Sequence, residues 1–286
     1  MHVSMATSGG NRGEPNEDFA GAVPGAVVLL DGAGIPGTEA ICCHGVAWYT
    51  HRLGGALLGR LSRDDGAGLT AILGGAIGEV AADHRDTCDI ANVSSPQATV
   101  VVIRSRGARL DYLVLADSFL VLSRISAGPL VITDEREVMT RRACSAPLAS
   151  VARGSTEYQR VWDACLEALQ ARRNQPGGYW IAKDDPAVAG EAVTGSYLLQ
   201  ELDAAALLSN GAARVRSLYA HMTWLGVLEV LRASGPDEVI RRVRRAERII
   251  SNPNPTTPDD ATVAYCTQLQ HLDVHESRRA AAAFHR

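Results

Sequence analysis

The sequence predicts a protein of the α+β class, with its helices and its antiparallel strands in separate stretches of the chain. Two long helical patterns come first, over Thr38 to Leu61 and over Leu69 to Asp83. From Ser94 onward the chain has short runs rich in β-branched residues with tight connections, which is typical of a β-meander. Two helices followed by consecutive hairpin strands favour this class, because a parallel sheet requires strands and helices that alternate.

The elements before the meander follow from their apolar residues. Gly25 to Leu30 is a continuous apolar run that ends at Asp31, as expected for a strand buried on both faces. Thr38 can cap the first helix, whose apolar stripe continues to Leu61. The glycine-containing stretch 66–68 interrupts the chain before the second helix.

The meander and the second half of the chain complete the predicted fold. The meander strands are expected over Ala98 to Arg104, Leu110 to Ala116, Phe119 to Arg124 and Pro129 to Thr133. We then expect a helix over Thr156 to Arg173 and two weaker strands over Tyr179 to Ala182 and Tyr197 to Leu199. A further strand is expected over Ala204 to Ser209, followed by two helices over Ala212 to Ala233 and Pro236 to Ile250. The last strand is expected over Ala261 to Thr267. No linker is long enough to divide the chain, so we expect one domain over 1–268 and a polar, alanine-rich tail over 269–286.

Composition limits the classes of function. The chain has 286 residues, of which 46% are hydrophobic, and this is enough for a sizeable core. Its net charge of −4 and its aromatic content of 5% disfavour nucleic-acid binding, which needs basic surfaces or stacking platforms. We see neither a signal-peptide pattern nor an apolar run long enough to span a membrane. We therefore expect a cytoplasmic protein with no nucleic-acid and no membrane partner.

The six cysteines are expected to be reduced thiols. None forms a Cys-x-x-Cys pair, and their spacing fits no zinc ribbon or finger. The run Cys42-Cys43-His44 contains metal-ligating residue types within the first predicted helix. Adjacent residues on a helix point about 100° apart, so the three could not easily share one ion. Ordinary helix packing is therefore the favoured interpretation of this run.

Two further patterns each have a functional and a structural interpretation. Gly32 to Gly37 matches the glycine-rich signature of dinucleotide-binding proteins, but Pro36 lies where the helix should begin and no acidic residue ends a second strand. The basic run from Arg241 to Arg248 could bind nucleic acid or an acidic partner. On a helix its arginines spread around much of the surface, which favours a solvated helix face.

Polar clusters lie at the edges of the predicted strands throughout the chain. They are Asn16-Glu17-Asp18, Asp31-Gly32, Asp117-Ser118, Asn210-Gly211 and Asp259-Asp260. Mg²⁺ and Mn²⁺ take oxygen ligands, and the backbone at a strand end holds a carboxylate firmly in place. Inside a strand the same carboxylate would be buried without a partner, which is costly. The pattern therefore predicts a site for hard metal ions.

The order and the flanking residues of these clusters resemble the PPM family, the metal-dependent protein phosphatases of the 2C type. The matching segments are NEDF at 16–19, VVLLDGAG at 27–34, ATVVVIR at 98–104, LDYLVLADS at 110–118, ALLSNG at 206–211 and DDATVAYC at 259–266. The resemblance spans residues 10 to 267. It implies a sandwich of two antiparallel β-sheets flanked by helices (α-β-β-α), which agrees with the α+β prediction.

The resemblance also implies which residues hold two Mg²⁺ or Mn²⁺ ions at one end of the sandwich. Asp31 would bridge both ions. Glu17 and the Gly32 carbonyl would bind one of them, and Asp18 would reach that ion through water. Asp259 would bind the other ion.

Four positions of the family pattern differ in this chain or are less firmly matched. Asn210 stands where the family normally has a second aspartate on the ion held by Asp259. Asp117 lies in Ala-Asp-Ser, where the family has Gly-Asp-Ser, and could help to hold a third, weaker ion. Arg12 could clamp the phosphate, although it is one residue further from Glu17 than the usual arginine. Ala33 replaces a histidine of many eukaryotic members, as is common in bacterial ones.

The implied activity is the hydrolysis of phosphoserine and phosphothreonine in phosphorylated protein substrates by a water activated between two metal ions. Such chemistry requires no protein nucleophile, which agrees with the lack of a Ser-His-Asp or Cys-His arrangement. The alternative is a weakly active or inactive member that binds and regulates a partner. Asn210 supports this alternative, because a neutral amide removes one negative charge from the shell of a divalent ion.

Overall fold

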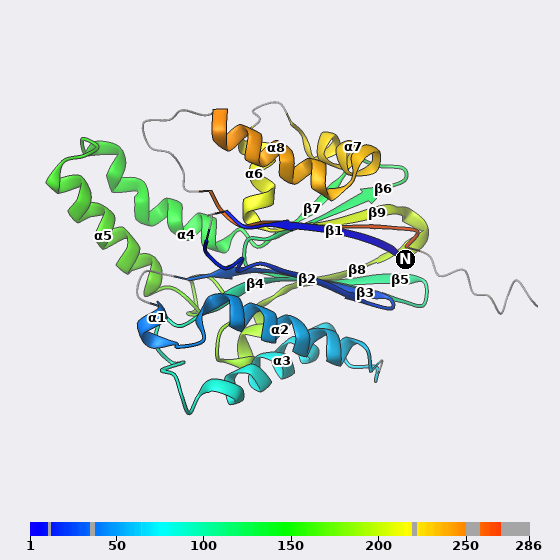
Figure 1. Cartoon of the computed structure of the whole chain (residues 1–286), viewed down its shortest axis with the longest axis horizontal. Helices are drawn as coiled ribbons and strands as arrows, with labels where there is room; N and C mark the ends of the chain where they lie inside the picture. The colour runs from blue at the N-terminus through cyan, green and yellow to red at the C-terminus, as the bar shows by residue number, and fades with distance from the viewer. Residues whose placement is uncertain (11–12, 35–37, 64, 219–221, 250–257, 270–286) are drawn as a thin grey trace, which may run out of the picture.

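The structure, a computed structural model, describes residues 1–10, 13–34, 38–63, 65–218, 222–249 and 258–269. Two antiparallel five-stranded sheets stack on each other, and helices cover both outer faces (Figure 1). This arrangement confirms the predicted α+β sandwich. Residues 270–286 of the predicted tail lie outside the described part, so the division of the chain at residue 268 stays a prediction.

Each sheet combines strands from distant parts of the chain. One sheet has the order β1-β10-β9-β6-β7, formed by β1 (His2–Ser8), β10 (Ala261–Thr267), β9 (Leu202–Leu208), β6 (Phe119–Arg124) and β7 (Leu130–Ile132). The other has the order β2-β3-β4-β5-β8, formed by β2 (Phe19–Val23), β3 (Ala26–Ala33), β4 (Gln97–Arg106), β5 (Arg109–Leu115) and β8 (Val193–Leu198). All paired strands run antiparallel, so the end of one strand meets the beginning of its neighbour.

The apolar core has three layers, and β3 contributes to two of them. Val27 and Leu29 are buried between the sheets. Val28 and Leu30 are buried against the helices α2 (Gly45–Leu61) and α3 (Leu69–His84). Because both faces of β3 are covered, its sequence is a continuous apolar run, as predicted. The third layer lies between the other sheet and the helices α6 (Asn210–Leu218), α7 (Trp224–Ser234) and α8 (Pro236–Ile249).

Two helices project beyond one end of the sandwich, where they lie against each other (Figure 1). They are α4 (Arg136–Ser145) and α5 (Thr156–Gln170). The remaining helical elements are short: α1 (Thr38–Ile41), η1 (Ala146–Ser150), η2 (Pro186–Glu191) and η3 (Leu199–Glu201). The helix pair α4–α5 therefore forms a wall beside the strand ends at which the polar clusters lie.

The structure divides two of the predicted helices. The helix expected over Thr38 to Leu61 is interrupted at residues 42–44, and α2 starts at Gly45, whose φ of 77° is a left-handed conformation that glycine adopts easily. The helix expected over Ala212 to Ala233 is instead α6 and α7. The second of these has its own N-terminal cap, because the Thr223 side chain accepts a hydrogen bond of 3.2 Å from the Gly226 N–H.

Other differences concern weakly patterned segments. Tyr179 to Ala182 is not a strand, since within it only isolated bridges form, such as the one between Ala98 and Ala182. The sequence prediction omitted β1, β2 and α4. β1 is an edge strand with several polar residues, β2 is short, and α4 is rich in arginine, so none of them has a clear apolar period.

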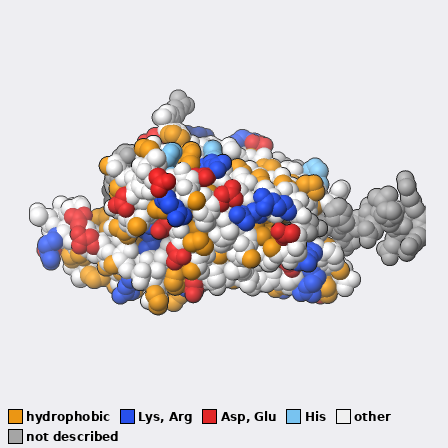
Figure 2. Space-filling view, turned by 90° about the horizontal axis from the view of Figure 1, so that it is seen from below, with side chains coloured by type: hydrophobic (Ala, Val, Ile, Leu, Met, Phe, Trp, Pro, Cys, Tyr) orange, Lys and Arg blue, Asp and Glu red, His pale blue; other side chains and the backbone are white. Residues whose placement is uncertain are grey.

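The surface carries interspersed charges. On the face covered by α2 and α3, basic and acidic side chains alternate (Figure 2), and the ion pair between Arg52 and Asp83 joins these two helices. In the basic run of α8, Arg241 and Arg242 both pair with Glu238, while Arg244 pairs with Glu247. No helix within the described ranges combines the length and the apolar composition that a membrane crossing needs.

Candidate metal centre

Six of the predicted site residues line one cavity at the end of the sandwich. The cavity has a volume of about 420 Å³ and also borders α4 and α5. The predicted residues along its wall are Glu17, Asp31, Gly32, Asp117, Asn210 and Asp259. Asp18 is buried beside them, close enough for its charge to act on Asp31. Arg12 lies outside the described residues.

Two glycines allow these segments to approach one another. A Cβ atom on Gly32 would lie 2.4 Å from the Glu17 carbonyl oxygen, and a Cβ atom on Gly211 would lie 2.0 Å from the Asp260 carbonyl oxygen. Either contact is far shorter than a real Cβ contact, so a larger residue would push the loop away. The glycine after Asp31 and the glycine after Asn210 therefore bring the chain before β2 and the chain before β10 to the strand ends.

Asp31 lies at the centre of the carboxylates. Its Oδ2 accepts a hydrogen bond of 2.8 Å from the Asn210 backbone N–H, which connects the end of β3 to the start of α6. Burial raises the pKa of Asp31 well above its usual value, and the charges of Asp18, Asp259 and Asp117 raise it further. An ionised Asp31 in this position needs a nearby positive charge.

Asp18 has the clearest unmet requirement for a cation. Its side chain is 4% exposed, and neither carboxylate oxygen makes a hydrogen bond of normal geometry to the described residues. Burial raises its pKa to about 7, and the neighbouring Thr262 and Ser209 side chains offset this shift only in part. Burial, followed by the charges of Asp260 and Asp259, also raises the pKa of Glu17 to about 7.

Asp117 and Asn210 form a direct side-chain pair. The Asn210 Nδ2 donates to Asp117 Oδ2 over 2.6 Å. An ionised carboxylate can only accept hydrogen bonds, so this contact fixes which end of the amide faces Asp117. Ala116, just before Asp117, has a φ of 65°, a conformation that favours glycine. This conformation gives a physical reason for the glycine that the resemblance leads one to expect there.

Asp259 and Asp260 point to different partners. Asp259 Oδ2 accepts a hydrogen bond of 2.8 Å from Arg214 Nη2, so a cation of the chain already faces this predicted ligand. Asp260 accepts backbone N–H groups from Gly10 at 2.7 Å and from Glu17 at 2.6 Å. Asp260 therefore positions the loop that carries Glu17 and Asp18.

Sequence reasoning did not identify the other charged groups of the site. Arg141 of α4 borders the cavity and donates from Nε to Glu137 Oε1 at 3.0 Å. Arg173, beyond α5, also borders it, and contacts the Tyr179 hydroxyl and the Val93 carbonyl. Neither arginine, nor Arg214, belongs to a motif that the sequence shows, and only the folded chain brings them to the strand ends.

The residues present fit hard divalent ions. The donor set consists of carboxylate and carbonyl oxygens, which is the set that Mg²⁺ and Mn²⁺ prefer. Several carboxyl groups crowd together with raised pKa values, and Asp18 has two buried oxygens without a hydrogen bond. A bound cation would satisfy both features. The fit is weaker on the side of Asp259, where Arg214 supplies a positive charge and Asn210 is neutral.

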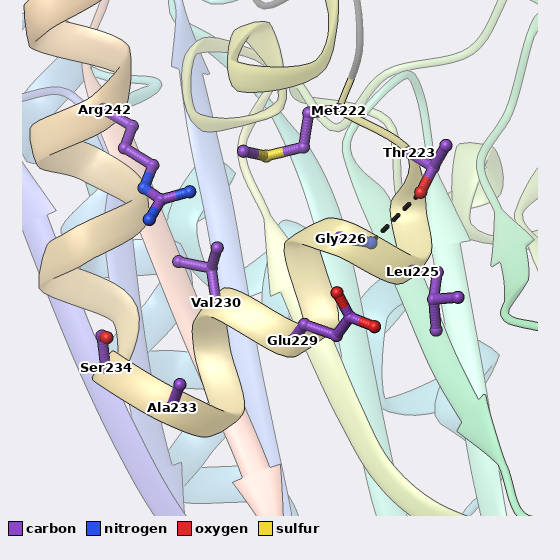
Figure 3. A pocket seen from close by; sticks show the side chains of 9 residues that line it. All are labelled: Met222, Thr223, Leu225, Gly226, Glu229, Val230, Ala233, Ser234 and Arg242. Atoms are coloured by element: carbon purple, nitrogen blue, oxygen red, sulfur yellow. Dashed lines mark hydrogen bonds between the residues drawn. The ribbon is translucent and has the colours of Figure 1, made fainter.

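A larger cavity, of about 610 Å³, lies elsewhere, over α7 and the adjoining face of α8 (Figure 3). Leu225, Val230 and Ala233 give it an apolar wall, and Glu229 and Arg242 are its charged residues. The described residues that line it include no cluster of carboxylates and no nucleophile beside a base. Size alone therefore does not locate the chemistry, and the smaller cavity at the strand ends is the candidate site.

Neither the known family models nor the curated proteins include a match to this chain. Solved structures do match. The catalytic domain of the serine/threonine protein phosphatase PstP, in complex with two manganese ions, is 19% identical with a TM-score of 0.58, over 93% of this chain and 97% of that one. The chain has the PPM phosphatase fold.

Two further structures agree. The PPM Ser-Thr phosphatase MsPP from Mycobacterium smegmatis is 14% identical with a TM-score of 0.54, over 93% of this chain and 98% of that one. PppA of Pseudomonas aeruginosa is 16% identical with a TM-score of 0.54, over 92% and 96%. The predicted resemblance is thus confirmed at the level of the fold over almost the whole chain.

Proposed function

We propose that the chain is a Mg²⁺- or Mn²⁺-dependent phosphatase that hydrolyses phosphoserine and phosphothreonine in proteins. The observation that carries this proposal is the meeting of Glu17, Asp18, Asp31 and Asp259, from three distant segments, at one end of a PPM-type sandwich. The manganese ions in the structure of PstP, which shares the fold, support the choice of metal.

The proposed ligand sets are those that the resemblance implies, and the positions of the side chains support them. Asp31 is central and would face both ions. Glu17 and the Gly32 carbonyl would hold one ion, with Asp18 behind them, and Asp259 would hold the other. Two bound ions would supply an acidified water and would offset charge on the phosphoryl oxygens.

The surrounding residues keep these ligands in place. The Asn210 N–H fixes the Asp31 carboxylate, and Asp260 fixes the backbone of Glu17 through a short hydrogen bond. Asp117, which also borders the cavity, is held by the Asn210 amide and would take part in a weaker third site. Residues of α4 and α5 line one side of the cavity.

Arg141 is a candidate contact for the substrate phosphate, in addition to Arg12. It borders the cavity, and its partner Glu137 is largely buried. A guanidinium can bind two phosphoryl oxygens through its fork of donors. When a phosphate entered, the arginine could keep one donor on Glu137 and turn another to the substrate.

A weakly active or inactive regulatory protein is the second candidate function, and two observations favour it. Asn210 uses its amide nitrogen on Asp117, and Arg214 already contacts Asp259. Both reduce the negative charge available to the ion beside Asp259. A catalytic protein and a regulatory protein differ in that only the first requires both ions.

Phosphate release from a phosphothreonine peptide, with Mn²⁺ and with a chelator, tests the proposal. We expect release that depends on Mn²⁺ and disappears in Asp31→Asn, while the exposed Asp203→Asn at the other end of β9 behaves as wild type. Calorimetric titration with Mn²⁺ then separates the two functions. Binding at a single class of sites, together with no phosphate release at any Mn²⁺ concentration, would support the regulatory protein.

A further inference from the structure

Three sulfur atoms and one ring nitrogen meet near α1, apart from the carboxylate cluster. Cys42, Cys43 and His44 form the connection between α1 and α2, and Cys88 follows α3. One ligand atom each from Cys42, His44 and Cys88 lies within 4.8 Å of the others. Cys43 Sγ lies 3.7 Å from Cys88 Sγ and also 3.7 Å from His44 Nδ1.

The helix argument against a shared ion does not apply to the folded chain. The predicted helix is broken between Ile41 and Gly45, so these residues do not belong to one continuous helix. Gly45, with its left-handed φ of 77°, turns the chain into α2. Cys88, which the sequence places far from this run, is the residue that completes the group. Cys42, Cys43 and His44 were interpreted as ordinary packing residues of one continuous helix, and the break in this helix shows that its continuity was wrongly assumed.

Four of the six distances among these ligand atoms are close to those of tetrahedral coordination. Zinc–sulfur bonds of about 2.3 Å and zinc–nitrogen bonds of about 2.0 Å place two sulfurs about 3.8 Å apart, and a sulfur and a nitrogen about 3.5 Å apart. The Cys43–Cys88 sulfur pair is at 3.7 Å. His44 Nδ1 lies 3.3 Å from Cys88 Sγ, 3.7 Å from Cys43 Sγ and 3.9 Å from Cys42 Sγ.

The surroundings suit a soft or borderline metal ion. Cys42 is 1% exposed and Cys43 is exposed, so the group has a protected side and an access side. The His44 ring stacks on Trp48 with centroids 4.3 Å apart, and this contact holds its orientation.

We propose that Cys42, Cys43, His44 and Cys88 bind a structural Zn²⁺ ion in a Cys₃His site. The ion links the α1–α2 connection to the segment after α3. The Asp89 N–H already donates to the Ile41 carbonyl across this junction, at 3.3 Å. α1 comes after β3, which carries Asp31 and Gly32, so the ion would hold the helix that follows the candidate metal centre in the sequence. The site is independent of the proposed phosphatase activity.

Zinc content and cobalt spectroscopy test this site directly. The full chain is purified under reducing conditions with excess Mg²⁺, which prefers the oxygen ligands of the carboxylate cluster. We expect a stoichiometric amount of zinc by mass spectrometry. Replacing zinc by Co²⁺ should give the thiolate-to-cobalt charge-transfer bands and the intense visible bands of tetrahedral coordination, which a carboxylate site does not produce.

Variants assign the ligands. Cys88→Ser and His44→Gln should lose the zinc and the cobalt bands, whereas Cys144→Ser, a cysteine of α4 outside the group, should keep both. Cys43→Ser should weaken zinc affinity by roughly tenfold or more if Cys43 is the fourth ligand. A strong zinc chelator should lower the midpoint of thermal unfolding of the wild type, and added Mg²⁺ should not restore it.

Several results would overturn the proposal. The proposal is wrong if reduced wild-type protein, shown to be folded by circular dichroism, binds no zinc and gives no thiolate-to-cobalt bands with Co²⁺. An unchanged zinc affinity in Cys43→Ser would show that Cys43 is not the fourth ligand. The purified protein could instead contain a disulfide between Cys43 and Cys88 and bind no zinc after this disulfide is reduced. That result would assign the thiols to redox chemistry. The cobalt spectrum of the wild type needs no variant, so misfolding of Cys88→Ser does not affect it.

Discussion

Replacing Asn210 by aspartate changes almost no volume but adds one negative charge beside the proposed ion of Asp259. At about 4 Å and an effective dielectric constant of about 20, a carboxylate and a divalent ion attract each other by roughly 8 kcal/mol. Repulsion from Asp117 at a similar distance costs about 4 kcal/mol. The lost hydrogen bond from Asn210 Nδ2 to Asp117, now 2.6 Å long, costs a further 1.5–3 kcal/mol or so. Both costs are present with and without the ion, so they lower the stability of the fold, whereas the attraction, reduced by screening and by desolvation of the site, should raise ion affinity by at least about 1.4 kcal/mol, which is roughly tenfold.

The assay is phosphate release from a phosphopeptide as a function of Mn²⁺ concentration. Asn210→Asp should reach half of its maximal rate at roughly tenfold lower Mn²⁺ than the wild type. Without metal the same variant should unfold at a lower temperature, because the repulsion with Asp117 is then not compensated. The control is Gln200→Glu, which adds the same charge at an exposed position in η3. An unchanged Mn²⁺ requirement, or a lower requirement in the control as well, would refute the electrostatic reasoning.

Three further predictions follow from the same geometry. Asp31→Asn should lower phosphatase activity at least tenfold more than Asp117→Asn, about 1.4 kcal/mol in the barrier, and equally small losses in kinetic assays would contradict a bridging role. Arg214→Gln, which removes the hydrogen bond to Asp259, should lower the Mn²⁺ concentration for half-maximal binding in calorimetry, and a higher one would show that Arg214 supports the site. The metal-free protein should lose stability as pH rises through about 7, because the folded state holds protons on Glu17 and Asp18 that the unfolded state has released. Added Mn²⁺ should therefore raise the midpoint of thermal unfolding more at about pH 8 than at about pH 5.5, and an equal rise at both would count against metal binding by these groups.

The sequence allowed prediction of those parts of the site that lie in local patterns. Asp31 follows a continuous apolar run and Asp259 precedes another, so hydrophobicity placed both near strand ends. The expectation that the strand stops before Asp31 is wrong, because β3 continues to Ala33 and pairs Asp31 with Thr99. The resemblance to the PPM family then indicated that these ends meet. The backbone conformation of Ala116 and the close contacts at Gly32 and Gly211 explain why the motifs have their small residues.

The contacts between distant segments could not be predicted in this way. Arg214 reaches Asp259, and Cys88 reaches His44, only because helices and loops of different layers pack together. The break before Gly45 depends on a left-handed glycine in a run that otherwise reads as helical. Edge strand β1 has too little apolar periodicity to be recognised, although its pairing with β10 completes one sheet.

Anomalous diffraction from crystals grown with Mn²⁺ tests the central claim most directly. The proposed site predicts two anomalous peaks about 3.5–4 Å apart, with the Asp31 carboxylate between them and Glu17 and Asp259 on opposite sides. A weaker peak beside Asp259 than beside Glu17 would agree with the neutral Asn210 and with the Arg214 contact. Saturating Mn²⁺ with no peak within bonding distance of Asp31 would contradict the claim that these carboxylates form a metal centre.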